Sequence, residues 1–196
     1  MADEITIQDY EDFPYRLLKY CGIDVRVSNR AYIRRPSLVS LGNHVGIDAF
    51  NYITTGADIG DYVHLASSNT FIGHNKTDII KMEHFTGMSS GNRIIVSSDE
   101  WMGEGLVSPI PPEEFRDKQV EGGVTFKMFS GITSNVVINP GVTLGMGSVV
   151  GACSFVTEDT EPWVIYYGVP ARPVKERRRD KMIEYAKRLG YEVPGY

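Results

Sequence analysis

Large apolar residues recur every six positions along two stretches of this chain, and this period restricts the possible folds more than any other feature. Apolar residues fill all twelve hexad positions, whereas an apolar content of 42% would fill about five of them by chance. The hexad positions are Leu41, Ile47, Ile53, Ile59, Leu65 and Phe71, followed by Phe126, Ile132, Ile138, Leu144, Val150 and Val156. An α-helix repeats every 3.6 residues and an ordinary strand every two, so neither produces this pattern. A six-residue repeat predicts a parallel β-helix.

In a β-helix each hexapeptide forms one short strand and a corner, and three hexapeptides form a triangular coil of about 18 residues. Small or β-branched residues stand two positions before most hexad residues, with Asn51 and Asn69 as polar exceptions. A β-sandwich would instead alternate every two residues, with turns about every 8 to 12 residues. We therefore expect an all-β protein, a left-handed parallel β-helix of about five coils.

The six-residue period breaks twice. Phe71 and Met82 are 11 residues apart, which we interpret as one residue fewer than two hexapeptides. Ile94 and Phe126 are 32 residues apart, and residues 97–123 between them hold three prolines and many charges but no hexapeptide pattern. Because long loops in compact domains are usually functional, this range is expected to form a long loop extruded from the coil.

The two ends of the chain lack the period. Residues 1–32 contain an apolar cluster and are expected to cap the open end of the β-helix, which then extends over residues 33–168. Residues 169–196 are expected to form a tail and an α-helix, because apolar residues from Met182 to Leu189 follow helical spacing.

Composition limits the classes of function. A chain of 196 residues fits one domain, and a net charge of −5 argues against sequence-independent nucleic-acid binding, which needs a broad basic surface. The chain contains no stretch of about 18 apolar residues, which a membrane span would need. Its acidic first residues do not resemble a secretory signal. Cys21 and Cys153 alone form neither a disulfide framework nor a zinc ligand set. We therefore expect a cytoplasmic protein that uses no metal.

Residues 138–177, INPGVTLGMGSVVGACSFVTEDTEPWVIYYGVPARPVKER, resemble the end of the hexapeptide-repeat acyltransferases. This superfamily includes galactoside, maltose and serine acetyltransferases, and Gly-Val-Pro-Ala after a last coil is its most specific signal here. The stretch SSDEWMGEGL, followed by PIPPEEFR, resembles the loop of a polysaccharide-biosynthesis branch. The resemblance implies an acetyltransferase with acetyl-CoA as donor and a sugar or nucleotide sugar of lipopolysaccharide or capsule as acceptor. It also implies a homotrimer, with coenzyme A in the groove between neighbouring β-helices.

The resemblance extends to individual site residues. The positions that match coenzyme A-contacting residues of the family are Ser134, Ala152, Thr157, Arg172 and Lys175. The two basic residues among them are suited to the coenzyme A phosphates. Asn69 matches an acceptor-binding asparagine. Galactoside acetyltransferases have their catalytic histidine where the loop leaves the coil, and this chain has Asp99 at that position.

Acyl transfer from a thioester requires the attacking amine or hydroxyl to lose a proton, and a neutral histidine is the usual base. If one residue is missing from the period after Phe71, Asp99 is 36 repeat positions after His64, which equals two coils. Asp99 should then lie on the same edge as His64, about 10 Å above it. His74, in Ile-Gly-His-Asn, resembles an Ile-x-His-acidic motif that holds the base in other acyltransferases of this fold. We predict His64 first and His74 second as the base, with Asp99 or Glu100 positioning the acceptor. A mechanism without a side-chain base is the alternative if the acceptor is an amine with a pKa near neutrality.

Two other classes of function use the same fold. A γ-type carbonic anhydrase binds zinc with three histidines, two of them about five residues apart, whereas the histidines here are 20, 10 and 10 residues apart. A trimeric scaffold that has lost its active site would bind acetyl-CoA without turnover. Zinc content and turnover separate these alternatives from an acetyltransferase.

Overall fold

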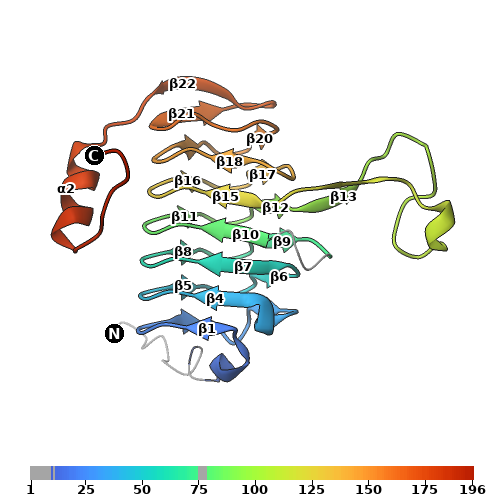
Figure 1. Cartoon of the computed structure of the whole chain (residues 1–196), viewed down its shortest axis with the longest axis horizontal. Helices are drawn as coiled ribbons and strands as arrows, with labels where there is room; N and C mark the ends of the chain where they lie inside the picture. Colours follow the sequence, from blue (N-terminus) through green and yellow to red (C-terminus); the bar gives the residue numbers. More distant parts are fainter. Residues whose placement is uncertain (1–9, 11, 75–78) are drawn as a thin grey trace, which may run out of the picture.

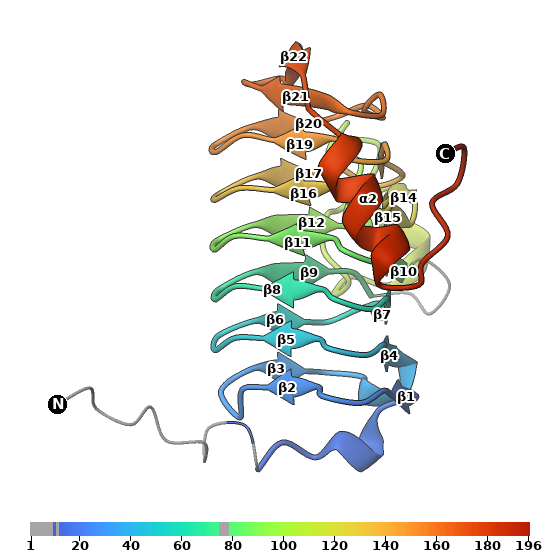
Figure 2. The same cartoon turned by 90° about the vertical axis from the view of Figure 1, so that its left-hand side faces the viewer.

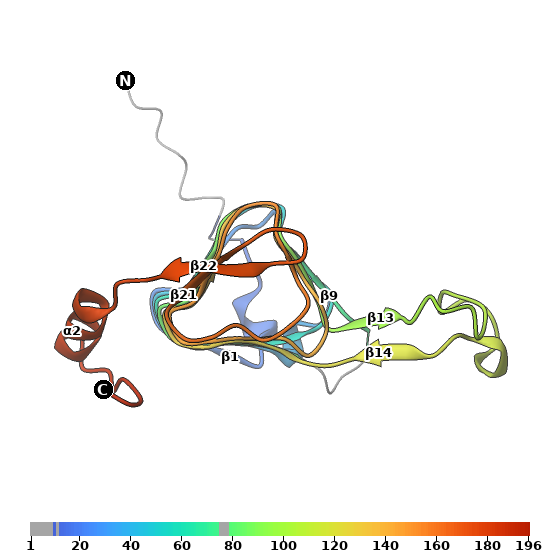
Figure 3. The same ribbon diagram turned by 90° about the horizontal axis from the view of Figure 1, so that it is seen from above.

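The protein is a parallel β-helix. The segment between β12 (Arg93–Ile95) and β15 (Val124–Phe126) extends from one side as an arm, and the α-helix α2 (Asp180–Arg188) lies on the other side (Figure 1). The computed structural model describes residues 10, 12–74 and 79–196. Over these residues the solenoid has about seven turns. Seen from above, the coils superpose as a triangle, with the arm and α2 at different corners (Figure 3). The predicted fold class is confirmed, together with its extruded loop and C-terminal helix, although about five coils was too low a number.

Three sheets, parallel except for the last strand β22, form the sides of the triangle, and successive coils add strands to each of them (Figure 2). Sheet A contains β1 (Tyr20–Cys21), β4 (Val39–Leu41), β7 (Gly56–Ile59), β10 (Ile79–Met82), β15 (Val124–Phe126) and β18 (Thr143–Leu144). Sheet B contains β2 (Arg26–Val27), β5 (Gly46–Ile47), β8 (His64–Leu65), β11 (Gly87–Met88), β16 (Gly131–Ile132), β19 (Val149–Val150), β21 (Val164–Tyr167) and β22 (Arg172–Glu176). Sheet C contains β3 (Tyr32–Ile33), β6 (Tyr52–Ile53), β9 (Thr70–Ile72), β12 (Arg93–Ile95), β17 (Val137–Ile138) and β20 (Phe155–Val156). The A–B, B–C and C–A corners join these sheets in chain order.

The hexad residues are the core of the solenoid. All twelve are buried, and none is more than 4% exposed. Equivalent positions pair from coil to coil, as Ile47 does with Leu65 and Phe126 with Leu144. Each short strand therefore needs only one large inward side chain to bury its share of the core, which explains a period of six instead of two.

The polar exceptions form a buried ladder inside the B–C corner. The carboxamide oxygen of Asn51 accepts the Asn69 N–H at 3.2 Å, and that of Asn69 accepts the Asn92 N–H at 2.9 Å. The Asn92 oxygen in turn accepts the Val136 N–H at 2.8 Å. Each asparagine thus satisfies a buried backbone donor of the next coil, and such donors are costly to leave unpaired.

The first break in the period is an insertion at the C–A corner. Leu41 pairs with Ile59, 18 residues later, but Ile59 pairs with Met82, 23 residues later. Five extra residues therefore lie between β9 and β10. The spacing from Phe71 to Met82 is one hexapeptide plus five residues, and the interpretation as two hexapeptides minus one residue was wrong.

The first coil lies within the range predicted as a cap. β1 begins at Tyr20, and of the described residues only those before it, including η1 (Tyr15–Leu17), lie beneath the coils. There the Tyr15 hydroxyl accepts the Val27 N–H at 3.0 Å, and Phe13 is buried against the same core. At the other end, β22 pairs antiparallel with β21 and covers the edge of the last coil.

Candidate active site

The arm leaves the solenoid at the C–A corner, between β12 and β15. Its stem consists of β13 (Ser97–Asp99) and β14 (Gln119–Glu121), which pair antiparallel, and its outer part contains η3 (Glu113–Phe115). The arm extends far beyond the triangle (Figures 1 and 3). The stem therefore brings the two ends of the extruded loop together directly beside the coil.

His74 lies at the foot of this stem. Its Nδ1 is 2.7 Å from Ser97 Oγ, and its Nε2 is 3.8 Å from a Glu121 carboxylate oxygen. About half of the imidazole is exposed. A histidine held through one ring nitrogen has a fixed orientation and keeps the other nitrogen available to a bound substrate.

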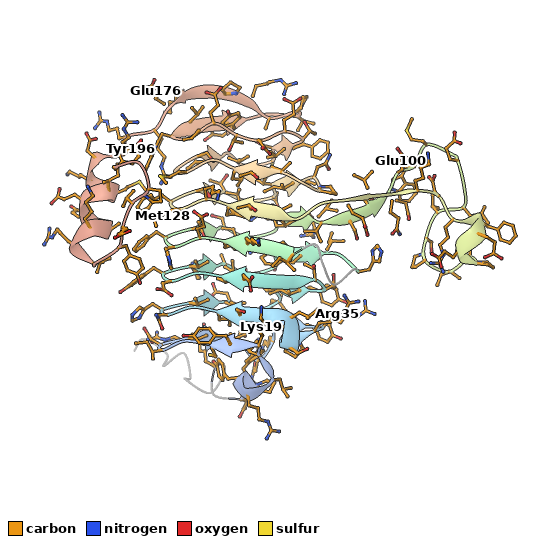
Figure 4. All side chains as sticks on the ribbon, viewed as in Figure 1. Lys19, Arg35, Glu100, Met128, Glu176 and Tyr196 are labelled. Atoms are coloured by element: carbon orange, nitrogen blue, oxygen red, sulfur yellow. The ribbon has the colours of Figure 1, made fainter. Side chains whose placement is uncertain are left out.

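Asp99 lies at the outer end of the same stem, two residues beyond Ser97 along β13. One of its carboxylate oxygens accepts the Ser108 N–H at 2.9 Å, which fixes the side chain against the arm. The Glu100 N–H donates to the Lys118 carbonyl across the stem, and Figure 4 shows Glu100 on the arm, away from the coil. A carboxylate accepts hydrogen bonds from amines and hydroxyls, so Asp99, two residues from Ser97 along β13, can hold an acceptor group at the stem.

The structure places His64 elsewhere. It begins β8 in sheet B, where it pairs with Gly46 and Gly87, whereas Asp99 extends from the C–A corner. The prediction that both lie on one edge was wrong, because the five-residue insertion changes the count between them. His64 Nε2 is 3.1 Å from a carboxylate oxygen of Asp48, and the imidazole is largely exposed.

His64 separates two shallow grooves on the outer face of sheet B. The lower groove has a volume of about 380 Å³ and includes His44, and the upper one has a volume of about 440 Å³ and includes Ser89. The equivalent positions of the neighbouring strands are glycines: Gly46 directly below His64, and Gly87 and Gly131 above it. Because these three positions have no side chains, an extended ligand could approach the backbone of sheet B closely there.

Asn69 is not available to a ligand. Its side chain is fully buried in the asparagine ladder and donates to the Ala66 carbonyl at 2.6 Å. The prediction of an acceptor-binding role for Asn69 was wrong, because the side chain points into the corner and serves the backbone of the neighbouring coils.

The five residues predicted to contact coenzyme A lie in the upper coils. Ser134 and Ala152 occupy equivalent B–C corner positions of successive coils, where the N–H of Cys153 donates to the Ser134 carbonyl.

Thr157 and Arg172 line one cavity of about 290 Å³. The same cavity is also lined by the acidic residues Glu158, Asp159 and Glu161. Lys175 lies on exposed β22, paired with Ile165, and does not line this cavity.

Sequence reasoning missed Ser97, Glu121 and Arg35. Arg35 donates from Nη1 to the His74 carbonyl at 2.8 Å and so contacts the foot of the stem from below. Ser97 and Glu121 could have been found, because the two ends of an extruded loop must lie side by side and these residues lie at those ends. Arg35 had no such signal, since its contact crosses 39 positions.

Carboxylates with shifted pKa lie outside the arm. A hydrogen bond from His44 and the charge of Arg26 lower the pKa of Asp24 at the A–B corner. Burial alone would raise the pKa of Asp61, but hydrogen bonds from Tyr191 and from the Asn43 backbone outweigh it and lower the pKa. These shifts arise from structural contacts on the side of the triangle that carries α2.

No three His, Cys, Asp or Glu side chains within residues 10, 12–74 and 79–196 lie close enough together to hold a metal ion. In the same part of the chain, no helix has the length and apolar character needed to cross a membrane.

Stacked hexapeptide coils, an extruded arm and a histidine near a carboxylate at its foot are the features expected of a β-helical acyltransferase. No family model matches the chain. It is 31% identical over 175 residues to dTDP-4-amino-4,6-dideoxy-D-glucose acyltransferase of Escherichia coli, covering 85% of each chain. The chain therefore belongs to the hexapeptide-repeat acyltransferase family that includes this enzyme, which confirms the resemblance stated from the sequence.

Solved structures and a shorter match agree with this assignment. AntD, an N-acyltransferase from Bacillus cereus solved with dTDP and 3-hydroxybutyryl-CoA, is 32% identical, with a TM-score of 0.83. The similarity covers 89% of this chain and 90% of AntD. Galactoside O-acetyltransferase of Escherichia coli (strain K12) is 57% identical over 51 residues, which is 26% of this chain and 25% of that enzyme.

Proposed function

We propose that this protein transfers an acyl group from acyl-coenzyme A to the amino group of a nucleotide-linked amino sugar. The similarity to dTDP-4-amino-4,6-dideoxy-D-glucose acyltransferase over 85% of both chains carries the proposal. The AntD complex with dTDP and 3-hydroxybutyryl-CoA supports the same classes of donor and acceptor, and nitrogen as the acylated atom. Acetyl-CoA is the donor expected from the sequence, and the product would serve a surface polysaccharide.

The residues at the foot of the arm fit the chemistry of this reaction. The amine nitrogen attacks the thioester carbonyl carbon, so a C–N bond forms, the C–S bond breaks and coenzyme A leaves as a thiolate. Asp99 would hold the amine through a hydrogen bond, and His74 would take the proton that the nitrogen loses. Glu121, 3.8 Å from His74 Nε2, would stabilise the resulting imidazolium, and the proton then passes to the thiolate.

The acyl donor would approach from the upper coils. Ser134 and Ala152 at the B–C corner, and Thr157 and Arg172 at the top cavity, would contact coenzyme A, with Lys175 near its phosphates. The thioester end of the donor would then lie lower, at the level of the arm, where the acceptor would be held.

A homotrimer would complete this site. The flat face of sheet B, with His64, and the stem of the arm lie on different sides of one chain, so a neighbouring copy is needed to bring such surfaces together. Exposed apolar side chains on the arm, including Trp101 and Ile110, support its contact with another copy. We place the enzyme in the cytoplasm, where acyl-coenzyme A and nucleotide sugars are made.

A thiol-release assay tests the proposed function. The purified protein is incubated with acetyl-CoA or 3-hydroxybutyryl-CoA and with dTDP-4-amino-4,6-dideoxyglucose. The matched control acceptor is a dTDP-6-deoxysugar with a hydroxyl group at the same carbon. We expect thiol release with the amino sugar only. Binding of acyl-coenzyme A without turnover on any nucleotide-linked amino sugar would instead support a non-catalytic scaffold.

A further inference from the structure

His74 lies where the chain leaves sheet C, so strand pairing does not fix its position. The pairing of β9 with β12 ends at Ile72, opposite Ile95, and His74 follows two residues later. Backbone N–H and C=O groups outside a strand ladder are paired by side chains or by water instead. The orientation of the His74 imidazole therefore depends on the contacts that side chains from other parts of the chain make with this segment.

The residue before His74 is held from the coil below. Thr54 directly follows β6, and its Oγ1 accepts the Gly73 N–H at 3.1 Å. Gly73 also packs closely against the start of the arm, because a Cβ at this position would lie 2.3 Å from a methyl group of Val96. Only glycine lets the segment lie this close, so the backbone that leads into His74 is fixed on both sides.

Arg35 provides the hold on His74 itself. Its Nη1 donates to the His74 carbonyl at 2.8 Å, while Ser97 Oγ lies 2.7 Å from Nδ1 of the imidazole. One residue thus contacts the backbone of His74 and the other contacts its ring. Because the ring position follows from the backbone position and two side-chain torsions, loss of the backbone contact would let the imidazole move.

The place of Arg35 in the fold suits this role. It lies between β3 and η2 (Pro36–Leu38), and its carbonyl accepts the Leu38 N–H at 3.0 Å, which fixes its backbone. β3 lies two strands below β9 in sheet C, about 10 Å at the usual strand spacing, so the contact needs a long side chain. Figure 4 shows Arg35 on the side of the solenoid from which the arm extends.

Ordering such a side chain has a cost. An arginine that ends on one carbonyl loses more rotamer freedom than an arginine that stays in solvent. The coils are already joined by their strand ladders, and the contact of Arg35 crosses 39 positions to reach the one histidine at the foot of the arm. The position of this histidine is therefore what the contact changes.

We propose that Arg35 is a positioning residue of the acyl transfer, which holds the backbone of His74 so that Nε2 faces the acceptor amine at the stem. The inference rests on the proposed function, because it takes His74 as the base. Arg35 acts through His74 and contacts neither substrate. If its guanidinium instead bound a phosphate of the acceptor directly, its loss would raise the KM of the nucleotide sugar and leave kcat unchanged.

The test compares Arg35→Gln with the wild-type enzyme. Arg34→Gln is the matched control, because it removes the same charge from the neighbouring residue, which is exposed. Arg35→Lys keeps a charged donor on a long side chain. The measurements are kcat, the KM of both substrates, the thermal midpoint and the NMR resonances of isotope-labelled histidine, with that of His74 assigned through His74→Gln.

We expect Arg35→Gln to lower kcat about tenfold or more and to change both KM values less than about threefold, because a displaced base affects the chemical step. The His74 resonance should shift, while those of the other three histidines stay in place. Arg35→Lys should lose less activity than Arg35→Gln, and Arg34→Gln should behave as the wild type.

Two results for a folded Arg35→Gln variant overturn the inference while the acyltransferase function stands. One is an unchanged His74 resonance, and the other is a raised KM for the nucleotide sugar at an unchanged kcat. If Arg35→Gln does not fold, the same two criteria apply to Arg35→Lys. If the wild-type enzyme acylates no nucleotide sugar, the proposed function fails, but a shifted His74 resonance in Arg35→Gln still supports the hold on His74 and an unchanged one overturns it.

Discussion

The imidazole of His74 is held at Nδ1 by Ser97 Oγ and faces Glu121 with Nε2. If His74 accepts the proton of the acceptor amine, His74→Gln should lower kcat about 100-fold, because general-base catalysis contributes at least this factor. The KM values of both substrates should change less than about threefold, since glutamine keeps a hydrogen-bonding group there. Steady-state kinetics at saturating acyl-coenzyme A measures this effect.

His64→Gln is the matched control for His74→Gln. His64 also pairs with a carboxylate, Asp48, at 3.1 Å, but it lies on sheet B and not at the stem. We expect its kcat to fall by much less than that of His74→Gln, by under about tenfold, since His64 borders the groove on sheet B and is not the proposed base. The reverse result, with a large loss at His64 and none at His74, would assign the base to sheet B and contradict the role given to His74.

Single residues also show where a sequence pattern stops being informative. Asn69 matched an acceptor-binding residue by motif, yet its carboxamide serves the Asn92 backbone and the Ala66 carbonyl in a buried corner. A motif specifies the residue type and not the direction of the side chain. In a β-helix neighbouring positions alternate between core and surface, so a small error in alignment exchanges a ligand contact for a structural one.

At the scale of elements, α2 and the tail after it are held against a ladder of stacked rings at the A–B corner. The ladder consists of His44, Tyr62, Phe85, Phe129 and Trp163, with successive centroids 4.6 to 5.7 Å apart. Ala186 of α2 is buried in the cluster that contains Phe129 and Trp163. The Tyr191 hydroxyl donates to a carboxylate oxygen of Asp61 at 2.6 Å, which ties the tail to the third coil.

This hydrogen bond makes the docking of the tail depend on pH. Burial and the bond to Asp61 raise the pKa of Tyr191 to about 12, so its contribution is complete below about pH 10 and is lost as pH rises towards 12. The pKa of Asp61 is lowered, because hydrogen bonds outweigh its burial, so its contribution is present above about pH 4 and is lost in more acidic solution. The tail should therefore dock most firmly between these limits.

Fluorescence of Trp163 against pH, in a Trp101→Phe background, measures this docking. We expect Tyr191→Phe to weaken docking near neutral pH and to remove the component lost between about pH 10 and 12. An alkaline transition of unchanged size and midpoint in Tyr191→Phe would show that another group controls it.

The elements also show how far the sequence could predict the fold. The hexad period correctly identified twelve inward positions, because one buried side chain per short strand is a local requirement. It could not decide between a deletion of one residue and an insertion of five after Phe71, since both shift the phase equally. Only the pairing of Ile59 with Met82 resolves this, and pairing between coils is not local information. The misplacement of His64 relative to Asp99 followed from that ambiguity.

At the scale of the whole molecule, one chain presents on different sides the two surfaces that we propose to form the active site together. The stem of the arm with Asp99 leaves the C–A corner, and the flat groove above His64 lies on sheet B. Closed symmetry would place the same two surfaces against each other at every interface of a homotrimer. Its mass would be three times the 21.9 kDa of the chain.

Mixing two inactive variants tests whether each site is shared between chains. Asp99→Asn impairs the stem, and Gly87→Leu fills the groove on sheet B, where an added Cβ meets only the His64 carbonyl at 3.4 Å, an ordinary contact. Each variant alone should have little activity and remain a folded trimer. After exchange of subunits at a 1:1 ratio, roughly a quarter of the sites would combine an intact stem with an intact groove, so about a quarter of the wild-type rate should return. No recovery after proven exchange would mean that both surfaces act within one chain, and the arm would then have to fold back onto its own coil.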